Sequence, residues 1–530
     1  MKSWLERYPT RGRRVSATYE PSSQKCTFGT TRGCWNVRVD WDPAGEIASG
    51  RVDDVTGRVT EAWTGPQVAW KMARGGSGAF GGEKINSYSV WLGFCALFFF
   101  GLADYRRPLS WRNLDLLVLL SLSVSLWFFN RGDVLTSVPL AYPPMLYLIA
   151  RGLWIGLTGR AVRGRVLWPY WVLLFAAVFV AGFRIGLNLE DSNVIDVGYA
   201  GVIGAERISA GQSPYGHFPI EGTLKACGPA DAEGEVRDRI QTNGHCESAN
   251  PQGDTYGPVS YESYLPGYWI RGWSGKWDSL PAAHFTSIAF DLLCLIGLAL
   301  VGLRFGGAQL AGVLAFAWAA YPFTQYASSS NTNDSIPAAF LIWGFWLVTS
   351  AWARGIFVAL SGWTKFASLI VAPLWLTYPE ARWRPRSTTA YVAGFLLATV
   401  AAFSILLLEP HPLHAASVFF HRTLKNQVDR ESPFSLWDWR QYHAHGLPDL
   451  HLLQRVLQAA LVLAAIAFAF VPRRKSPLQL AALTLVLLVG FEFVLTYWLY
   501  TYIPWFFAFA AYALLAPGDR ADADAQPAPT

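Results

Sequence analysis

Apolar segments long enough to cross a lipid bilayer recur along this chain of 530 residues and constrain its fold more than any motif does. A membrane-spanning helix needs about 17–25 mostly apolar residues. Charged residues make up only 15% of the chain, whereas soluble domains average about 25%. The sequence therefore predicts an all-α polytopic membrane protein.

We expect about eleven full spans. They are predicted at residues 88–105, 113–129, 134–157, 166–183, 284–303, 308–326, 336–353, 388–408, 452–471, 478–497 and 503–516.

Residues 355–378 are apolar as well, but basic residues that favour the cytoplasmic side flank them at both ends. A re-entrant hairpin of two half-length helices, with Lys365 near its tip, satisfies both ends, because non-helical backbone is tolerated at membrane depth where protein surrounds it. A single span through this stretch is the alternative.

The arginines in the short loops predict the orientation. Arg106, Arg107 and Arg112 follow the first span, and another cluster follows the third; both favour the cytoplasm. Residues 1–87 and the polar loops 184–280 and 409–450 then lie outside.

Residues 1–87 are predicted to form a small polar α+β domain with a Gly-rich linker. Trp35–Trp41 alternates like a strand, Val52–Trp63 is typical of a hairpin, and Gly65–Arg74 is predicted to be a short helix. The hairpin and helix weakly resemble a PepSY-type domain. Because the start of the chain has no secretory signal, either the start is truncated or this domain is cytoplasmic. The tail, 517–530, is predicted to be disordered.

Four of the six cysteines fall into two sequence-local pairs within polar regions, Cys26 with Cys34 and Cys227 with Cys246. If these regions face an oxidising compartment, each pair is a possible disulfide.

The loop 184–280 contains the pattern that suggests an activity. Asp196-Val-Gly-Tyr199 is followed by Gly211-Gln-Ser-Pro214-Tyr215, and later by Asn333-Asp334, Arg354-Gly355 and an aromatic run around Trp505. Together these motifs, over about 166–516, resemble the integral-membrane glycosyltransferases of family 87 in the GT-C superfamily, which includes mannosyltransferases that use polyprenol-phosphate mannose. The three spans within 88–165 are additional to that module.

The resemblance implies that Asp196 deprotonates the acceptor hydroxyl, with Asp191 as the alternative. Either carboxylate would also suit the N-terminus of the helix predicted to begin near Val197.

A site that uses a lipid-phosphate sugar donor needs cations for the phosphate and hydrogen-bonding groups for the sugar. It also needs side chains that contact the acceptor. The candidates for binding the donor phosphate or sugar are Lys365, Arg422, Arg430, Asn333 and Asp334. The candidates for binding the acceptor are Tyr199, Tyr215, Tyr256 and Glu262. For Lys365 the competing interpretation is a lysine that extends its charged end to the membrane surface. For the others it is helix capping, solvation or an interfacial aromatic belt.

No metal site and no cofactor are expected. The histidines gathered between His411 and His445 lack a ligand spacing such as His-Glu-x-x-His, and the sequence has no Walker A loop or dinucleotide fingerprint. The basic residues set topology, so no nucleic-acid partner is expected.

The predicted function is transfer of a mannose- or arabinose-type sugar from polyprenyl phosphate to a glycan or glycolipid acceptor. It would take place at the outer face of the cytoplasmic membrane. A polytopic transporter or lipid flippase of the cell envelope is the alternative. The sequence identifies neither sugar nor acceptor.

Overall fold

A computed structural model gives the fold. It describes residues 12–21, 32–41, 45–64, 80–130, 134–161, 164–220, 224–228, 238–274, 280–382, 384–425, 434–437 and 448–517.

The N-terminal region is a four-stranded antiparallel sheet in the order β1-β2-β3-β4. The predicted strand Trp35–Trp41 and the predicted hairpin are confirmed, and Asp53 Oδ1 closes the hairpin turn by accepting from Thr56 N at 2.7 Å. The first strand was not predicted, and the expected helix Gly65–Arg74 lies outside the described residues. The strands are β1 (Arg13–Glu20), β2 (Cys34–Trp41), β3 (Gly45–Asp53) and β4 (Val59–Thr64).

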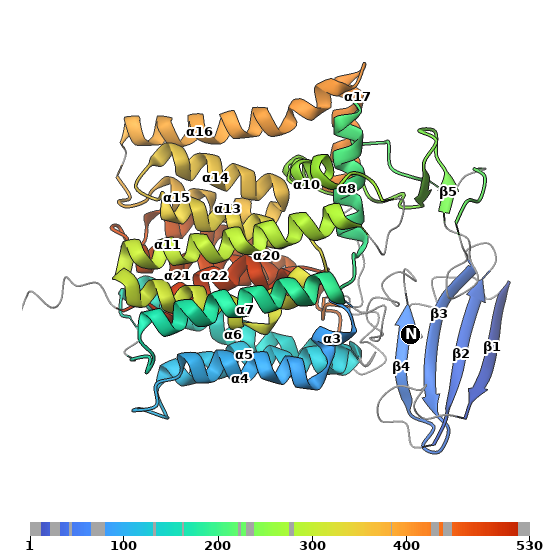
Figure 1. Cartoon of the computed structure of the whole chain (residues 1–530), viewed down its shortest axis with the longest axis horizontal. Helices are drawn as coiled ribbons and strands as arrows, with labels where there is room; N and C mark the ends of the chain where they lie inside the picture. The colour runs from blue at the N-terminus through green and yellow to red at the C-terminus, as the bar shows by residue number, and fades with distance from the viewer. Residues whose placement is uncertain are drawn as a thin grey trace, which may run out of the picture.

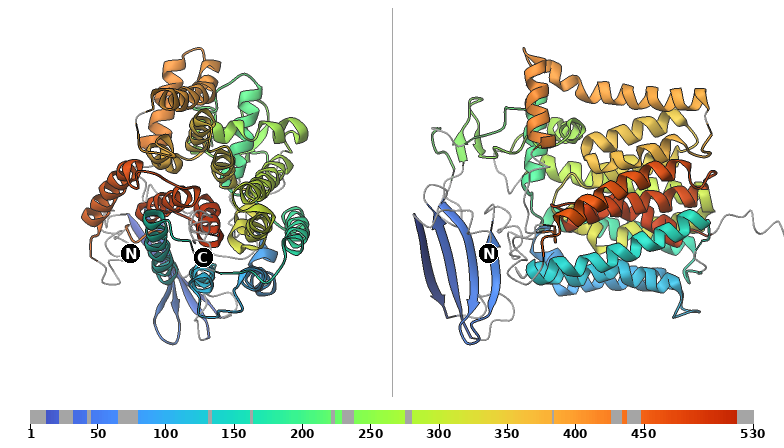
Figure 2. Two further views of the ribbon diagram at one scale, coloured as in Figure 1. Left: turned by 90° about the vertical axis from the view of Figure 1, so that its left-hand side faces the viewer. Right: turned by 180° about the vertical axis from the view of Figure 1, so that it is seen from behind.

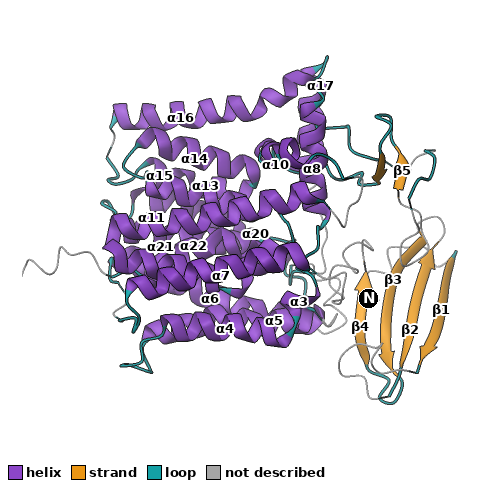
Figure 3. Ribbon diagram, viewed as in Figure 1, coloured by secondary structure: helices purple, strands orange, loops and turns teal. Residues whose placement is uncertain are grey.

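The rest of the described chain is mostly helical, and its helices lie side by side in one bundle (Figures 1 and 3). Four helices precede the large loop, close to the predicted spans. After α3 (Glu83–Asn86) they are α4 (Tyr88–Leu102), α5 (Trp111–Phe129), α6 (Val134–Thr158) and α7 (Tyr170–Glu190).

α11 (Pro281–Ala320) contains the span predicted at 284–303 and most of the span predicted at 308–326, joined by a sharp turn at Gly307; the last residues of the second predicted span lie in α12 (Pro322–Ser329). Gly307 has φ 76°, a left-handed conformation that glycine adopts without strain. The second half of α11 folds back against the first half. A hydrogen bond from Trp318 Nε1 to Asp291 Oδ1, at 2.8 Å, joins the two halves.

The predicted helical hairpin around Lys365 is present. α14 (Ala351–Thr364) ends at Lys365, and the chain returns through η3 (Phe366–Val371) and α15 (Ala372–Leu376). Arg354, at the start of α14, donates to the carbonyls of Trp375 and Tyr378 at 2.9 Å, so the two ends of the hairpin lie together. The helix predicted at 336–353 begins as expected, but α13 (Ser335–Trp346) ends seven residues earlier than predicted. Ser350 then caps the start of α14 by accepting from Ala353 N.

The remaining helices are α16 (Pro385–Phe403) continued by η4 (Ser404–Leu408), α17 (Pro412–Phe419), η5 (Phe420–Lys425), α20 (His451–Phe470), α21 (Pro477–Val494), η7 (Tyr500–Tyr502) and α22 (Ile503–Leu515). Of these, α16 with η4, α20, α21 and α22 follow predicted spans closely, whereas α17 and η5 lie in the predicted loop 409–450.

Six helices of the described chain are long and apolar enough to cross a membrane, and four shorter apolar helices accompany them. Leucines, valines and a phenylalanine lie exposed on the outer faces of α16 and α20, as expected for surfaces that lipid covers. The protein is therefore a multi-pass membrane protein by length and composition, and the number of eleven spans stays a prediction.

The polar loop after α7 lies at one end of the bundle. It forms α8 (Asp196–Ser209), β5 (Asp238–Ile240), β6 (Cys246–Ser248), α9 (Pro258–Glu262) and α10 (Leu265–Arg271). Figures 1 and 2 show α8 and α17 crossing that end of the bundle, with the N-terminal sheet beyond the same end. This arrangement agrees with the prediction that residues 1–87 and the loop share one side of the membrane.

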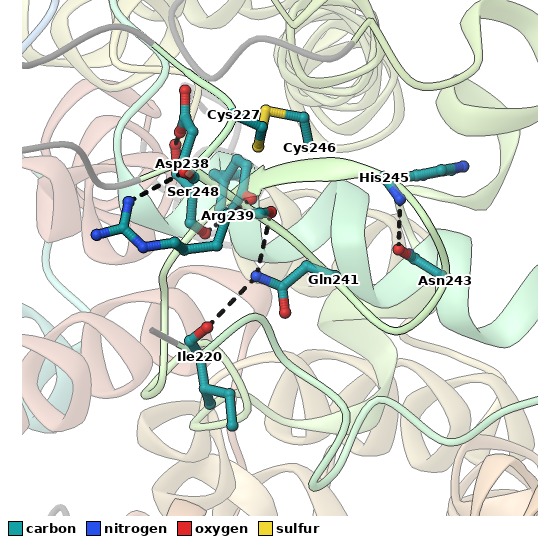
Figure 4. The surroundings of a disulfide bond; sticks show 10 residues. Ile220, Cys227, Asp238, Arg239, Gln241, Asn243, His245, Cys246 and Ser248 are labelled. Carbon is teal, nitrogen blue, oxygen red and sulfur yellow. Dashed lines mark hydrogen bonds between the residues drawn. A yellow bond between two sulfur atoms is a disulfide. The ribbon is translucent and has the colours of Figure 1, made fainter. Parts of the chain in front are cut away.

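Cys227 and Cys246 form a disulfide, as predicted, with a Cα–Cα distance of 5.9 Å (Figure 4). Cys34 is also disulfide-bonded, but its predicted partner Cys26 lies outside the described residues.

A buried ion pair joins α7 to α11 inside the bundle. Arg184 Nη2 lies 2.5 Å from Asp291 Oδ1, and both side chains are almost fully enclosed. Arg184 Nη1 also donates to Ala319 O at 3.0 Å and to Thr324 Oγ1 at 2.8 Å. No local sequence pattern predicts this pair.

We expect Asp291→Ala to lower the free energy of unfolding by about 3–5 kcal/mol, because it leaves a buried guanidinium without its counter-ion. Unfolding in detergent would measure the loss. The double variant Arg184→Met/Asp291→Leu should recover part of it, and Glu190→Ala, on the exposed end of α7, serves as the control. Equal stability of Asp291→Ala and the control would contradict this role.

Candidate active site

A cavity of about 420 Å³ lies where the start of α8 meets the tip of the Lys365 hairpin and the N-terminal ends of α20 and α22. Several distant parts of the chain meet there. Its polar lining includes Asp196, Thr255, Tyr256, Asp334, Thr364, Lys365, Thr423, Gln454, Arg455, Gln458, Thr496, Tyr497, Thr501, Tyr502 and Trp505.

Asp196, the predicted base, lines this cavity at the first residue of α8. Asp196 is not the N-cap residue of α8, because Ile195 occupies that position and Asp196 is the first residue of the helix. The segment before α8 is held by backbone bonds from Asn193 N to Ser329 O (3.1 Å) and from Ile195 N to Ser330 O (3.4 Å). These bonds fix the start of α8 beside the segment that leads to Asp334.

Asp334 and Lys365 form an ion pair in the cavity wall, with Lys365 Nζ 3.1 Å from Asp334 Oδ1. Asp334 stands at the N-cap position of α13, yet its side chain does not cap that helix and instead accepts from Trp505 Nε1 at 3.1 Å. The Asp334 carboxylate therefore contacts side chains of the cavity wall and not the backbone of its own helix.

Aromatic rings enclose the Lys365 ammonium. Its nitrogen lies 4.7 Å from the ring centre of Tyr502, 5.3 Å from that of Trp505 and 5.5 Å from that of Tyr256. Cation–π attraction at such distances holds a lysine in place. Tyr502 and Trp505 also stack on each other, with ring centres 4.3 Å apart.

Gly257 allows Tyr256 to approach the hairpin tip. A Cβ at this position would lie 1.9 Å from the carbonyl oxygen of Trp363, so only glycine fits between the two backbones. This contact accounts for the glycine of the Tyr256-Gly257-Pro258 sequence.

Three polar residues of the cavity were missed from the sequence: Gln454, Arg455 and Gln458 at the start of α20. Gln458 lies four residues after Gln454 and three after Arg455, spacings that put it beside both side chains on a helix, and Arg455 Nη1 donates to Gln458 Oε1 at 3.3 Å. A polar group at one end of an otherwise apolar span was the signal available.

Several predicted residues are not brought to the cavity. Asp191 accepts from the backbone N–H of Lys84, and Asn333 is buried and donates to Ser260 Oγ at 2.6 Å. Tyr199 donates to Ser248 O at 3.0 Å, and Tyr215 to Tyr256 O at 2.9 Å. These four side chains hold the surrounding loops together.

The two predicted external arginines have different outcomes. Arg422 is half-exposed and lies 3.8 Å from Asp254 Oδ2, and it is not among the residues lining the cavity, although its neighbours Thr423 and Leu424 are. Arg430 lies outside the described residues.

Glu262 lies in a second, mostly apolar cavity of about 380 Å³. Val259 of α9, Phe290 of α11, Phe340 of α13 and Leu360 of α14 contribute to its wall. Burial raises the pKa of Glu262 to about 7. In the part of the chain that the structure describes, this carboxyl has no hydrogen bond or ion pair.

Chemically, the main cavity combines a half-buried carboxylate with two cations and several aromatic rings. A carboxylate in this position can accept a proton, the cations can bind an anion, and tyrosine and tryptophan rings can lie against a sugar. Phe491, Leu495 and Leu499 make part of the same wall apolar.

No protein-family profile matches the chain, and no curated protein matches it. Among solved structures, it is similar to the crystal structure of ArnT from Cupriavidus metallidurans bound to undecaprenyl phosphate, with 16% sequence identity and a TM-score of 0.41. The match covers 65% of this chain and 59% of that one, so the chain spans less than two thirds of the length of ArnT. At this level of similarity no residue role is transferred, and the resemblance to family 87 stays a prediction.

The carboxyl of Glu262 predicts a pH dependence of stability. Between its ordinary pKa of 4.5 and about 7, the folded chain keeps a proton that the unfolded chain releases. The free energy of unfolding should therefore fall as pH rises through that window. Glu262→Gln should remove this contribution and be more stable at pH 8 by on the order of 1 kcal/mol, after allowance for partial exposure. Thermal unfolding at pH 5 and pH 8 would measure it; the same pH dependence in both proteins would contradict it.

Proposed function

We propose that the protein is a membrane glycosyltransferase that moves a sugar from a polyprenyl-phosphate donor to an acceptor hydroxyl. The observation that carries this proposal is the meeting of Asp196 with the Asp334–Lys365 pair in one cavity, at the polar end of an apolar bundle. The family 87 resemblance selects Asp196 independently of this geometry.

A lipid-linked donor suits the position of the cavity. One wall is α20, whose outward face bears exposed apolar residues such as Leu452, Val456 and Leu463. An isoprenoid tail can therefore stay in the bilayer while its phosphate reaches Arg455 at the start of the same helix. Because Lys365 is already paired with Asp334, the more exposed Arg455 is the first phosphate contact in this proposal.

Asp196 serves as the general base in the proposed reaction. It takes the proton from the acceptor hydroxyl as the oxygen forms a bond to the anomeric carbon, and the polyprenyl phosphate leaves with the electron pair of the broken bond. Lys365 and Arg455 stabilise the negative charge on that phosphate. Tyr256, Tyr502 and Trp505 orient the sugar.

The acceptor is proposed to be a glycan or glycolipid, and the reaction to take place at the outer face of the cytoplasmic membrane. Two observations support that side. The disulfide Cys227–Cys246 belongs to the loop that carries Asp196, and disulfides persist in oxidising compartments. The arginine clusters after α4 and α6 favour the cytoplasm for the opposite end of the bundle.

We expect Asp196→Asn to lower the rate of sugar transfer about 10²- to 10⁴-fold, because the amide cannot accept the proton. Membranes containing the protein would be supplied with radiolabelled polyprenyl-phosphate mannose or arabinose. Asp191→Asn, whose side chain lies away from the cavity, is the matched control. Full activity of Asp196→Asn would remove this residue as the base, and solute uptake without a covalent product would favour the transporter alternative.

Arg455→Gln should weaken donor binding about tenfold, the effect of losing one charge-assisted hydrogen bond of about 1.4 kcal/mol. The KM for the donor or the Kd for polyprenyl phosphate would show it. Arg474→Gln removes an exposed arginine between α20 and α21 and should change neither value. An unchanged donor KM for Arg455→Gln would place the phosphate elsewhere.

A further inference from the structure

A cluster of charged side chains outside the cavity joins α8 to the β5–β6 hairpin. Glu206 and Arg207 lie near the end of α8, Glu247 lies in β6, and His245 lies in the hairpin turn. Both carboxylates are buried, whereas the His245 side chain is 43% exposed. Figure 4 shows His245 beside Asn243 and next to the disulfide-bonded Cys246.

Arg207 binds both carboxylates. Its Nη1 lies 2.8 Å from Glu206 Oε2, and its Nη2 lies 2.8 Å from Glu247 Oε2. Nη1 also donates to Glu247 Oε1 at the longer distance of 3.5 Å. The guanidinium therefore fixes the orientation of both carboxylates, and the Oε1 atom of each one also faces His245.

Those two oxygens converge on His245. Nδ1 of the imidazole lies 2.8 Å from Glu206 Oε1 and 3.6 Å from Glu247 Oε1, and one donor atom from each residue lies within 4.8 Å of the others. Nδ1 is buried and makes no aligned hydrogen bond. Two metal bonds of about 2.0–2.1 Å at a tetrahedral angle hold their donor atoms roughly 3.3 Å apart, a value between the two distances found.

The charge balance also favours a cation. Two carboxylates face one guanidinium, which leaves one negative charge when both are ionised. A divalent ion between the two carboxylates would offset their mutual repulsion.

We propose that Glu206, His245 and Glu247 bind one zinc ion, which fastens the disulfide-bonded hairpin to α8. One imidazole and two carboxylates are ligands that zinc accepts, with water completing the coordination. Arg207 and Asn243 are the outer partners that orient the ligands, since Asn243 Nδ2 donates to Glu247 Oε1 at 3.0 Å and Arg207 binds both carboxylates.

The site is distinct from the histidines between 411 and 445 that the sequence analysis considered. It does not depend on the proposed transferase activity. A bound zinc ion would fasten α8, the helix that begins at Asp196, to the β5–β6 hairpin.

The test is zinc binding by the full chain in detergent, first freed of metal with a chelator and then given zinc chloride alone. We expect one zinc per chain by elemental analysis and a zinc-dependent rise in Tm. Removing a residue that only hydrogen-bonds to a metal ligand typically weakens metal binding roughly 10- to 100-fold. His245→Ala removes a ligand itself, so it should weaken zinc binding by more than that. Glu247→Gln should do the same, whereas His414→Ala, which changes an exposed histidine elsewhere, should not.

Because His245 is partly exposed, its alanine variant should fold, and a normal elution volume together with an intact Cys227–Cys246 bond would verify this. Absence of stoichiometric zinc in the wild-type protein would overturn the proposal. So would zinc binding that survives both His245→Ala and Glu247→Gln. Neither result bears on sugar transfer, so the two proposals fail independently.

Discussion

The buried ion pair between Arg184 and Asp291 is the contact on which the arrangement of the bundle depends. An unpaired charge inside an apolar bundle is costly, so α7 and α11 have to meet where these side chains can pair. Arg184 also holds Thr324, at the start of the segment that runs from α12 to Asp334. One turn further along α7, Asn188 donates to Ser328 O at 2.7 Å and to Asn331 Oδ1 at 2.9 Å.

Further hydrogen bonds link this buried region to the polar end of the protein. Asn331 Nδ2 donates to Asn193 O at 3.0 Å, and the backbone of residues 329 and 330 accepts from the segment before α8. Asp196 and Asp334 are therefore positioned by one hydrogen-bonded unit, although they are far apart in the sequence. A carboxylate held in this way loses little entropy when a substrate binds, which is the usual benefit of a preorganised site.

The polar loop after α7 holds α8 at its other end. The disulfide closes the β5–β6 hairpin, and Arg207 links that hairpin to the end of the helix through Glu247. Before the first residue of the helix, Asn193 N and Ile195 N donate to Ser329 O and Ser330 O. α8 is thus held at both ends, beside the cavity that Asp196 lines.

The sequence by itself determined the membrane class and most helix boundaries, and it suggested the hairpin at Lys365 and the pairing of Cys227 with Cys246. Each of these follows from local patterns, because the length of an apolar run, a flanking charge or a short cysteine spacing acts over neighbouring residues. It also singled out Asp196, Asp334, Lys365 and Tyr256, four residues that line one cavity. Only the tertiary structure decided that Lys365 pairs with Asp334, that Arg455 joins the same cavity, and that Asn333 and Tyr199 are bonded elsewhere. Those outcomes depend on which helices pack together, and packing is set by buried pairs such as Arg184–Asp291, whose partners lie 107 residues apart.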